Sequence, residues 1–167
     1  MTIVQAETFN VDTTLKQLEV AWNATGSPQP IAGGSDAPGI VDLQFVFNLQ
    51  TPTGGITKVG VPLDRANCKF PDFATLKSTI TSQSDPCYSR EQDIRTIEIY
   101  LLVRSRVKPL LTEGLRIPVQ TITGIGDVPQ RTTSTTSDTF PSLGAGYIYR
   151  VFSTTVYIRN MAREDFG

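Results

Sequence analysis

The sequence predicts an α+β fold, in which an antiparallel β-sheet carries one or two short helices and long loops. Several segments alternate apolar and polar residues with the period of a half-buried strand, and one segment between the two cysteines has helical spacing. Stretches rich in Gly, Pro, Ser and Thr separate these segments. With 167 residues and 39% hydrophobic content, the chain is long enough to bury one core. We therefore expect residues 1–167 to form one domain.

The first forty residues give the weakest patterns. Residues 1–11 read as an edge strand or an extended lead-in, and Asp12 or Thr13 is suited to cap a short helix. A strand over residues 18–22 is nearly as well supported as this helix. Residues 26–39 are Gly-, Pro-, Ser- and Ala-rich, which predicts a loop. The helix is suggested by apolar positions at i, i+3 and i+7, namely Leu15, Leu18 and Trp22.

Residues 41–61 predict a β-hairpin. Apolar residues occupy every second position from Val41 to Leu49, as in a strand that buries one face. The turn signal Thr51–Gly55 follows, and residues 56–61 are suited to return as a short antiparallel partner.

The segment around the two cysteines predicts a disulfide and a helix. Cys68 and Cys87 lie 19 positions apart in a polar stretch, and an even number of cysteines in an exported chain favours pairing. Reduced cysteines are the less favoured alternative. Residues 71–80 place Phe73, Leu76 and Ile80 at helical spacing behind a proline, which predicts one short helix inside the loop.

Two further strands are expected in the second half. Residues 94–105 form the most hydrophobic strand and are expected to be central in the sheet. Residues 147–160 alternate strictly and are expected to form the last strand. Between them, residues 108–146 are mostly loop, with a Thr/Ser run at 131–139 and a short strand at 119–122.

Composition argues against several function classes. The chain has no histidine, so Ser-His and Cys-His nucleophilic mechanisms are excluded, and no P-loop, dinucleotide or EF-hand pattern occurs. The net charge of -1 disfavours nucleic-acid binding by bulk electrostatics. No apolar run of about 18 residues is present, so this sequence shows no segment that would span a membrane. We expect no enzyme activity and no cofactor.

Four separated phrases resemble the C-terminal half of PilW-type minor pilins of type IV pili, in the same order. They are residues 40–47, the glycine pair 54–55, residues 94–105 ending in Leu-Val-Arg-Ser, and residues 149–160. The resemblance implies a pilin-like domain that lacks the N-terminal prepilin helix and leader. In that family the helix anchors the subunit in the inner membrane and later packs in the filament core.

This resemblance implies a non-catalytic subunit that assists pilus initiation or lies near the pilus tip. Its partners would be other minor and major pilins and a tip adhesin, on an extracellular filament assembled from the inner membrane and periplasm. A minor pseudopilin of a type II secretion system is a related alternative. A secreted adhesin or carbohydrate-binding β-domain is an alternative from another class, suggested by aromatic strands and the Thr/Ser-rich loop.

Three sets of side chains are candidate surface sites, namely tyrosines, arginines and aspartates. Tyr147, Tyr149 and Tyr157 share one strand face and are expected to contact another subunit, although packing within the sheet explains them equally well. A basic stripe for DNA is the less favoured interpretation of the strand arginines, because cross-strand pairing with Glu98, Glu113 or Asp42 would absorb their charge. These arginines are Arg95, Arg104, Arg106, Arg150 and Arg159. Calcium binding is a minor alternative for the aspartates flanking the cysteine loop, Asp64, Asp72, Asp85 and Asp93.

Overall fold

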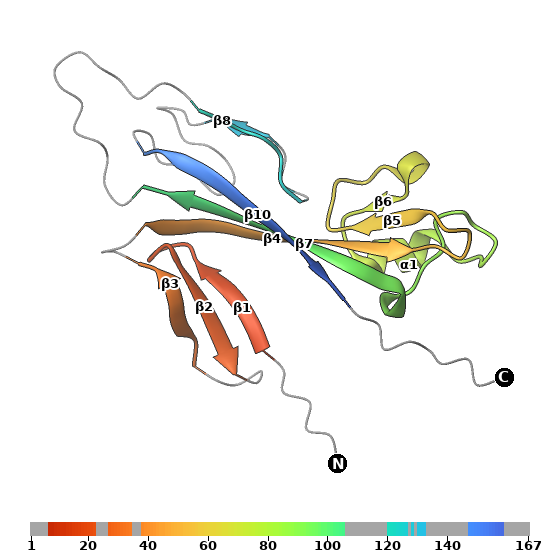
Figure 1. Cartoon of the computed structure of the whole chain (residues 1–167), viewed down its shortest axis with the longest axis horizontal. Helices are drawn as coiled ribbons and strands as arrows, with labels where there is room; N and C mark the ends of the chain where they lie inside the picture. The colour runs from red at the N-terminus through yellow and green to blue at the C-terminus, as the bar shows by residue number, and fades with distance from the viewer. Residues whose placement is uncertain are drawn as a thin grey trace. The chain divides into compact units, whose positions relative to one another are not determined.

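The structure of the chain is a computed structural model that describes residues 7–22, 27–34, 38–105, 120–126, 128, 130–132 and 147–158. Its strands form three sheets (Figure 1). A three-stranded sheet has the order β1-β2-β3, a five-stranded sheet has the order β10-β7-β4-β5-β6, and β8 pairs with β9. Contacts between Cα atoms divide the chain into two compact units, so the expectation of a single domain stays a prediction.

The expected α+β class is wrong, because the described residues are mostly β. They hold ten strands and one α-helix, α1 (Phe73–Thr79), which has only seven residues. The described residues also contain two single-turn 3-10 helices, η1 (Arg65–Asn67) and η2 (Glu91–Asp93). The expectation of a purely antiparallel sheet is wrong as well, since β5 (Ile56–Val59) pairs in parallel with β6 (Lys69–Phe70).

One unit comprises Met1–Leu43, Leu101–Ile122 and Arg131–Phe152. Its three-stranded sheet consists of β1 (Glu7–Asp12), β2 (Gln17–Trp22) and β3 (Gln29–Gly33), all antiparallel. The strand alternative for residues 18–22 is thus the correct one, and the helix is wrong. The loop expected over 26–39 is wrong in part, because β3 lies within it.

Asp12 explains why a helix-start signal leads here to a hairpin. Its carboxylate accepts hydrogen bonds from the amides of Thr14 at 2.7 Å and Leu15 at 2.9 Å, as an N-cap would. Lys16 then adopts a left-handed backbone with φ of 55°, which ends the turn and reverses the chain. Beyond it, β2 pairs with β1 along the whole length of both strands. Asp12 thus makes the hydrogen bonds of a helix cap, but the residues that follow it form the turn between β1 and β2.

The other unit comprises Gln44–Tyr100, Thr123–Gln130 and Ser153–Gly167, and it contains α1 and the cysteine loop. Its hydrophobic core collects Leu49, Val59, Phe70, Leu76, Ile80 and Cys87, all nearly inaccessible to solvent. The helix expected over 71–80 is confirmed. Asp72 begins it by accepting a hydrogen bond from the amide of Thr75 at 2.6 Å, and Leu76 turns into the core.

The long strands of the five-stranded sheet agree with the sequence patterns. β4 (Gly39–Gln50), β5, β7 (Ile94–Arg104) and β10 (Tyr149–Tyr157) confirm the strands expected over 41–49, 56–61, 94–105 and 147–160, with the last one shorter. β7 lies inside the sheet, between β10 and β4, while β4 is the middle strand.

The segment between the last two long strands is described only in part. β8 (Thr121–Ile122) confirms the short strand expected near 119–122, and β9 (Arg131–Thr132) takes up the start of the Thr/Ser run. Residues 133–146 of the expected loop lie outside the described residues. No helix in the described part of the chain combines the length and the apolar composition that a membrane-spanning segment requires.

Candidate interaction surface

The last strand, β10, forms one edge of the five-stranded sheet. Its direction relative to β7 follows from two backbone hydrogen bonds. The amide of Ser105 donates to the carbonyl of Ile148 at 2.8 Å, and the amide of Ile158 donates to the carbonyl of Arg95 at 2.9 Å. Ten residues separate the two bonds on each strand (105 − 95 and 158 − 148), so the pairing is antiparallel and keeps one register.

This register decides which backbone groups of β10 face outward. Residues of an antiparallel strand alternate between those bonded to a given neighbour and those that point to the other side. Because Ile158 bonds to Arg95 of β7 and Ile148 bonds to Ser105, directly after β7, the even-numbered residues of β10 face β7 and the odd-numbered residues face away. The amide of Tyr149 agrees with this, since it donates to the side-chain oxygen of Gln120 at 2.9 Å instead of to β7. The outward N–H and C=O groups of Val151, Ser153, Thr155 and Tyr157 come next along the edge.

The side chains of β10 are unusually exposed. Tyr149 is buried, and each of the eight residues after it is exposed. A strand inside a sheet normally buries at least one face, whereas β10 exposes apolar side chains along most of its length. The large apolar side chains concerned are Val151 at 38% exposure, Phe152 at 55%, Val156 at 45% and Tyr157 at 79%.

A shallow apolar pocket of about 330 Å³ lies beside the start of β10. It belongs wholly to the unit that contains the three-stranded sheet. Val103 on β7 and Phe152 on β10 contribute to it, together with Ile148, which is 39% exposed. The remaining lining residues are Pro38, Arg104, Ser105 and Arg150.

The three tyrosines expected to form a subunit contact have different surroundings. Tyr157 is largely exposed and remains suited to contact another chain. Tyr149 is only 6% exposed, so for this residue the burial favours the alternative of packing within the sheet. Tyr147 is partly buried, and the guanidinium carbon of Arg104 lies 4.5 Å from its ring centroid.

The expected basic stripe is only partly described. Arg95 donates to the side-chain oxygen of Gln50 at 2.8 Å, and Arg104 stacks on Tyr147. Arg150 is exposed next to the apolar pocket. Arg106 and Arg159, as well as the expected partner Glu113, lie outside the described residues. Glu98 pairs with Lys58 at 3.3 Å and not with an arginine.

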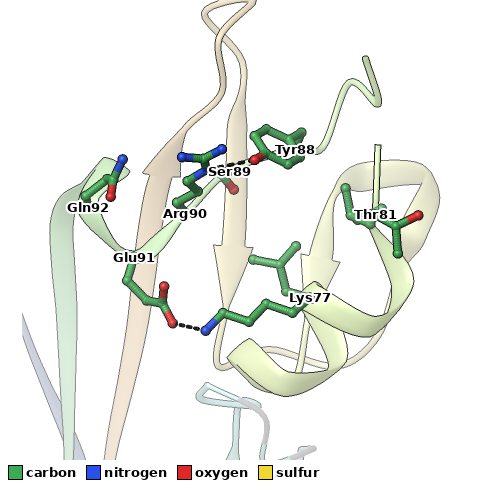
Figure 2. A pocket seen from close by; sticks show the side chains of 9 residues that line it. Lys77, Thr81, Tyr88, Ser89, Arg90, Glu91 and Gln92 are labelled. Atoms are coloured by element: carbon green, nitrogen blue, oxygen red, sulfur yellow. Dashed lines mark hydrogen bonds and ion pairs between the residues drawn. The ribbon is translucent and has the colours of Figure 1, made fainter. Parts of the chain in front are cut away.

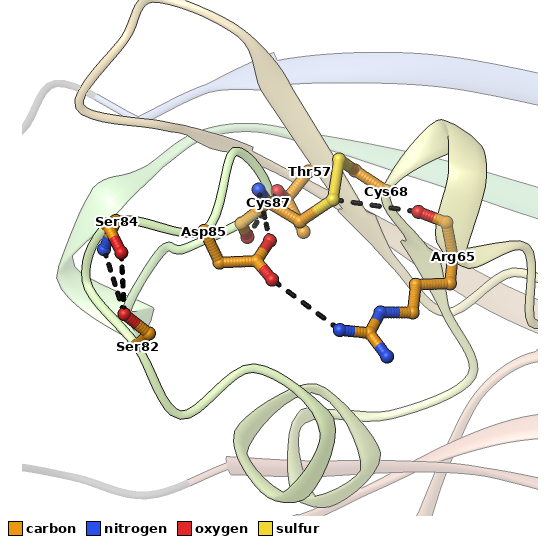
Figure 3. Close-up of polar contacts among 7 residues, drawn as sticks. All are labelled: Thr57, Arg65, Cys68, Ser82, Ser84, Asp85 and Cys87. Carbon is orange, nitrogen blue, oxygen red and sulfur yellow. Dashed lines mark hydrogen bonds and ion pairs between the residues drawn. A yellow bond between two sulfur atoms is a disulfide. The ribbon is translucent and has the colours of Figure 1, made fainter.

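The cysteine loop is closed by the expected disulfide between Cys68 and Cys87 (Figure 3). The carbonyl of Cys87 accepts a hydrogen bond from the hydroxyl of Thr57 at 2.8 Å, and its amide donates to Asp85 at 2.9 Å. Asp85 also lies 3.6 Å from the guanidinium of Arg65. These contacts hold the loop against β5.

The aspartates considered for calcium are used locally. Asp64 accepts hydrogen bonds from Asn67, which lower the pKa of its carboxyl, and Asp93 accepts one from the amide of Arg90 at 2.7 Å. Asp72 caps α1, and Asp85 holds the disulfide loop. In the part of the chain that the structure describes, no three acidic or other metal-binding side chains converge on one point. The calcium interpretation therefore has no geometric support.

A second pocket, between α1 and η2, is bordered by charged residues that pair with one another (Figure 2). The ammonium group of Lys77 bonds to Glu91, and this hydrogen bond lowers the pKa of the Glu91 carboxyl. Arg90 donates to the hydroxyl of Tyr88 at 2.7 Å. A carboxyl that stays ionised beside a lysine is poorly suited to act as a general acid near neutral pH.

Polar side chains from β4, β5 and β7 form a network around Glu98. The carboxylate accepts hydrogen bonds from Asn48 at 2.8 Å and from the hydroxyl of Tyr100 at 2.6 Å. Burial alone would raise the pKa of Glu98, but the bonds from Tyr100, Asn48 and Lys58 outweigh it and lower the pKa. The bond to Glu98 raises the pKa of Tyr100 to about 12. Neither group titrates near neutral pH, so the network stabilises the sheet and offers no acid–base pair.

The comparisons with known proteins give no relative. No protein-family model matches the chain, and no curated protein or solved structure matches it. The resemblance to PilW-type minor pilins therefore rests on the four sequence phrases alone.

The outward edge of β10 is the feature that sequence reasoning missed. Alternation identified the strand and its two faces, but it does not reveal which neighbour a strand has. One signal was present in the sequence: residues 149–157 contain no proline, glycine, lysine or acidic residue. Such residues normally protect an exposed edge.

Proposed function

We propose that this chain is a non-catalytic assembly subunit of a cell-surface filament, in the role of a minor pilin of a type IV pilus. The observation that carries the proposal is the exposed apolar side of β10. Ile148 and Phe152 lie beside a shallow pocket, where a soluble chain without partners would place polar residues. A subunit whose task is to bind other subunits needs such a surface.

Two further observations support this proposal. The disulfide between Cys68 and Cys87 is typical of proteins that mature in an oxidising compartment, such as the periplasm or the cell exterior. The carboxyls of Glu91 and Glu98 are paired and have lowered pKa values, and the pKa of Tyr100 is raised to about 12. These pairs therefore give no support to acid–base catalysis near neutral pH. A minor pseudopilin of a type II secretion system would present the same features, so the experiment must separate the two systems.

The test is a pull-down with the whole chain against pilins and pseudopilins from the same cell, with mass spectrometry of the retained proteins. A Phe152→Asp variant places a carboxylate on the apolar surface. A Leu63→Asp variant is the matched control, because Leu63 is 61% exposed and lies outside the pocket and β10. Both variants should keep the circular dichroism spectrum of the wild type.

Retention of minor and major pilins by the wild type and the control, with at least a tenfold loss for Phe152→Asp, is the expected result. Retention of pseudopilins alone would assign the chain to a secretion system. If folded, disulfide-bonded protein retains neither class and instead binds a glycan array, the filament role is wrong and the chain is an extracellular carbohydrate-binding domain.

A further inference from the structure

We propose that β10 is a self-pairing edge, at which two copies of this chain join antiparallel about a two-fold axis through Thr154. The partner is thus a second copy of the chain, and the two five-stranded sheets become continuous across the axis. This inference does not depend on the filament role, since its tests concern the backbone edge and the centre of β10, although Phe152 belongs to both this edge and the apolar pocket.

The backbone supplies the first part of the argument. Among the residues that the structure describes, no strand pairs with β10 on the side opposite β7. The outward groups of Val151, Ser153, Thr155 and Tyr157 form a row of donors and acceptors with strand spacing. The outward amide of Tyr149 already donates to Gln120, so the usable edge begins at Val151.

That usable edge is centred on Thr154. If the two copies pair antiparallel about this residue, Val151 of one copy lies opposite Tyr157 of the other, and Ser153 lies opposite Thr155. All four outward residues then exchange both backbone hydrogen bonds with a partner. None of these bonds competes with the ladder to β7.

The side chains are complementary in the same register. On the face of the even-numbered residues, Phe152 lies opposite Val156, and Thr154 lies opposite its own copy. On the other face, Val151 meets Tyr157, an aromatic and β-branched pair of the kind that stabilises antiparallel sheets. Arg150, the one charged residue of β10, lies opposite Ile158, so no like charges face each other. The four apolar side chains that contact each other are also the exposed ones.

The neighbouring register fits less well. Pairing about Ser153 would place Phe152 opposite Thr154 and Arg150 opposite Val156. It would also need the amide of Tyr149, which is bonded to Gln120. The structure therefore favours one register, and this makes the proposal testable residue by residue.

Composition argues for a copy of the same chain as the occupant. Edge strands that must stay unpaired carry lysine, proline or a bulge, and β10 has none of these. Val151 and Phe152 precede Thr154, and Val156 and Tyr157 follow it in the same order, so in the antiparallel pairing each aromatic residue lies opposite a valine. A strand that is complementary to its own reverse is suited to a two-fold contact.

The first test is cross-linking through single introduced cysteines in the whole chain. The two native cysteines form the disulfide, so an introduced cysteine is the reactive thiol. In the proposed pairing the two Thr154 Cα atoms lie about 4.5 Å apart, within disulfide range. The two Ser153 Cα atoms lie about 8 Å apart, beyond that range. Thr154→Cys should form a covalent dimer under mild oxidation at least tenfold faster than Ser153→Cys.

The second test measures association without cross-linking, by sedimentation equilibrium over a range of concentrations. Ser153→Pro removes an outward amide that the sheet itself does not use, and Ser153→Ala is the matched control. The wild type and the alanine variant should show a monomer–dimer equilibrium, and the proline variant should remain monomeric with an unchanged circular dichroism spectrum. A monomeric wild type at all concentrations, or faster cross-linking of Ser153→Cys than of Thr154→Cys, would overturn the proposal.

Discussion

Removal of the disulfide should cost a measurable and calculable share of the stability. The double variant Cys68→Ala/Cys87→Ala opens a loop whose ends are 19 residues apart in sequence. In the chain-entropy model, a loop of this length restricts the unfolded state enough to stabilise the fold by about 3 kcal/mol. Since domains of this size are typically stable by about 5–15 kcal/mol, the variant should fold but unfold at clearly lower denaturant concentration.

The assay is urea unfolding followed by circular dichroism, with the wild type measured before and after reduction. Reduction opens the same loop without removing either side chain, so it separates the effect of the cross-link from that of the buried Cys87 side chain. Both perturbations should lower the free energy of unfolding by similar amounts. A loss below about 1 kcal/mol in both experiments would refute the reasoning, since it would mean that the open loop is already ordered in the unfolded chain.

Three other predictions concern single residues of the same unit. Asp72→Ala should lower the free energy of unfolding by about 1 kcal/mol through loss of the α1 cap, whereas Asp72→Asn should retain most of it; urea unfolding of both variants checks this. Gly60→Ala should cost about 2 kcal/mol or more by the same assay, because φ is +91° and an added Cβ would lie 2.2 Å from the Phe45 carbonyl oxygen. An unchanged midpoint would contradict that backbone conformation. Glu98 has a lowered pKa, so its contribution is present above its ordinary value of 4.5 and is lost as the pH falls through the folded-state pKa. The stability difference between the wild type and Glu98→Gln should therefore shrink below pH 4.5, and a constant difference would show that the carboxylate network contributes nothing.

The strands and the helix around the core could be read from the sequence because local pattern and burial agree there. Leu49 and Val59 alternate with polar residues, and Leu76 and Ile80 have helical spacing behind a capping aspartate. Each of these positions belongs to the same core, so periodicity, together with the turn signal Thr51–Gly55 and the proline before the helix, was sufficient.

The N-terminal sheet could not be read in the same way. Leu15, Leu18 and Trp22 fit a helix as well as a strand, and the choice was made by the turn at Lys16 and by pairing with β1. Pro30 and Ala32 in β3 carry no strand signal, and their strand forms because β2 offers an edge. Tertiary pairing outweighed local propensity in both cases, and this is why the α+β expectation was wrong.

For the candidate site, the sequence identified β10 but did not separate its buried tyrosine from its exposed one. Alternation placed Tyr149 and Tyr157 on one face, yet only Tyr157 is exposed. The difference comes from the neighbours of each residue, because β10 is an edge strand and its start packs beside Gln120. Strand order is a long-range property that period-two patterns do not contain.

The central claim, that β10 is an interface strand, is tested most directly by residue-resolved amide hydrogen exchange at low and high protein concentration. The amides of Val151, Ser153, Thr155 and Tyr157 should exchange rapidly in dilute solution and become protected as concentration rises. The amides of Phe152 and Thr154, which face β7, should be protected throughout. Rapid exchange of the outward amides at every concentration, with and without pilin partners, would contradict the claim.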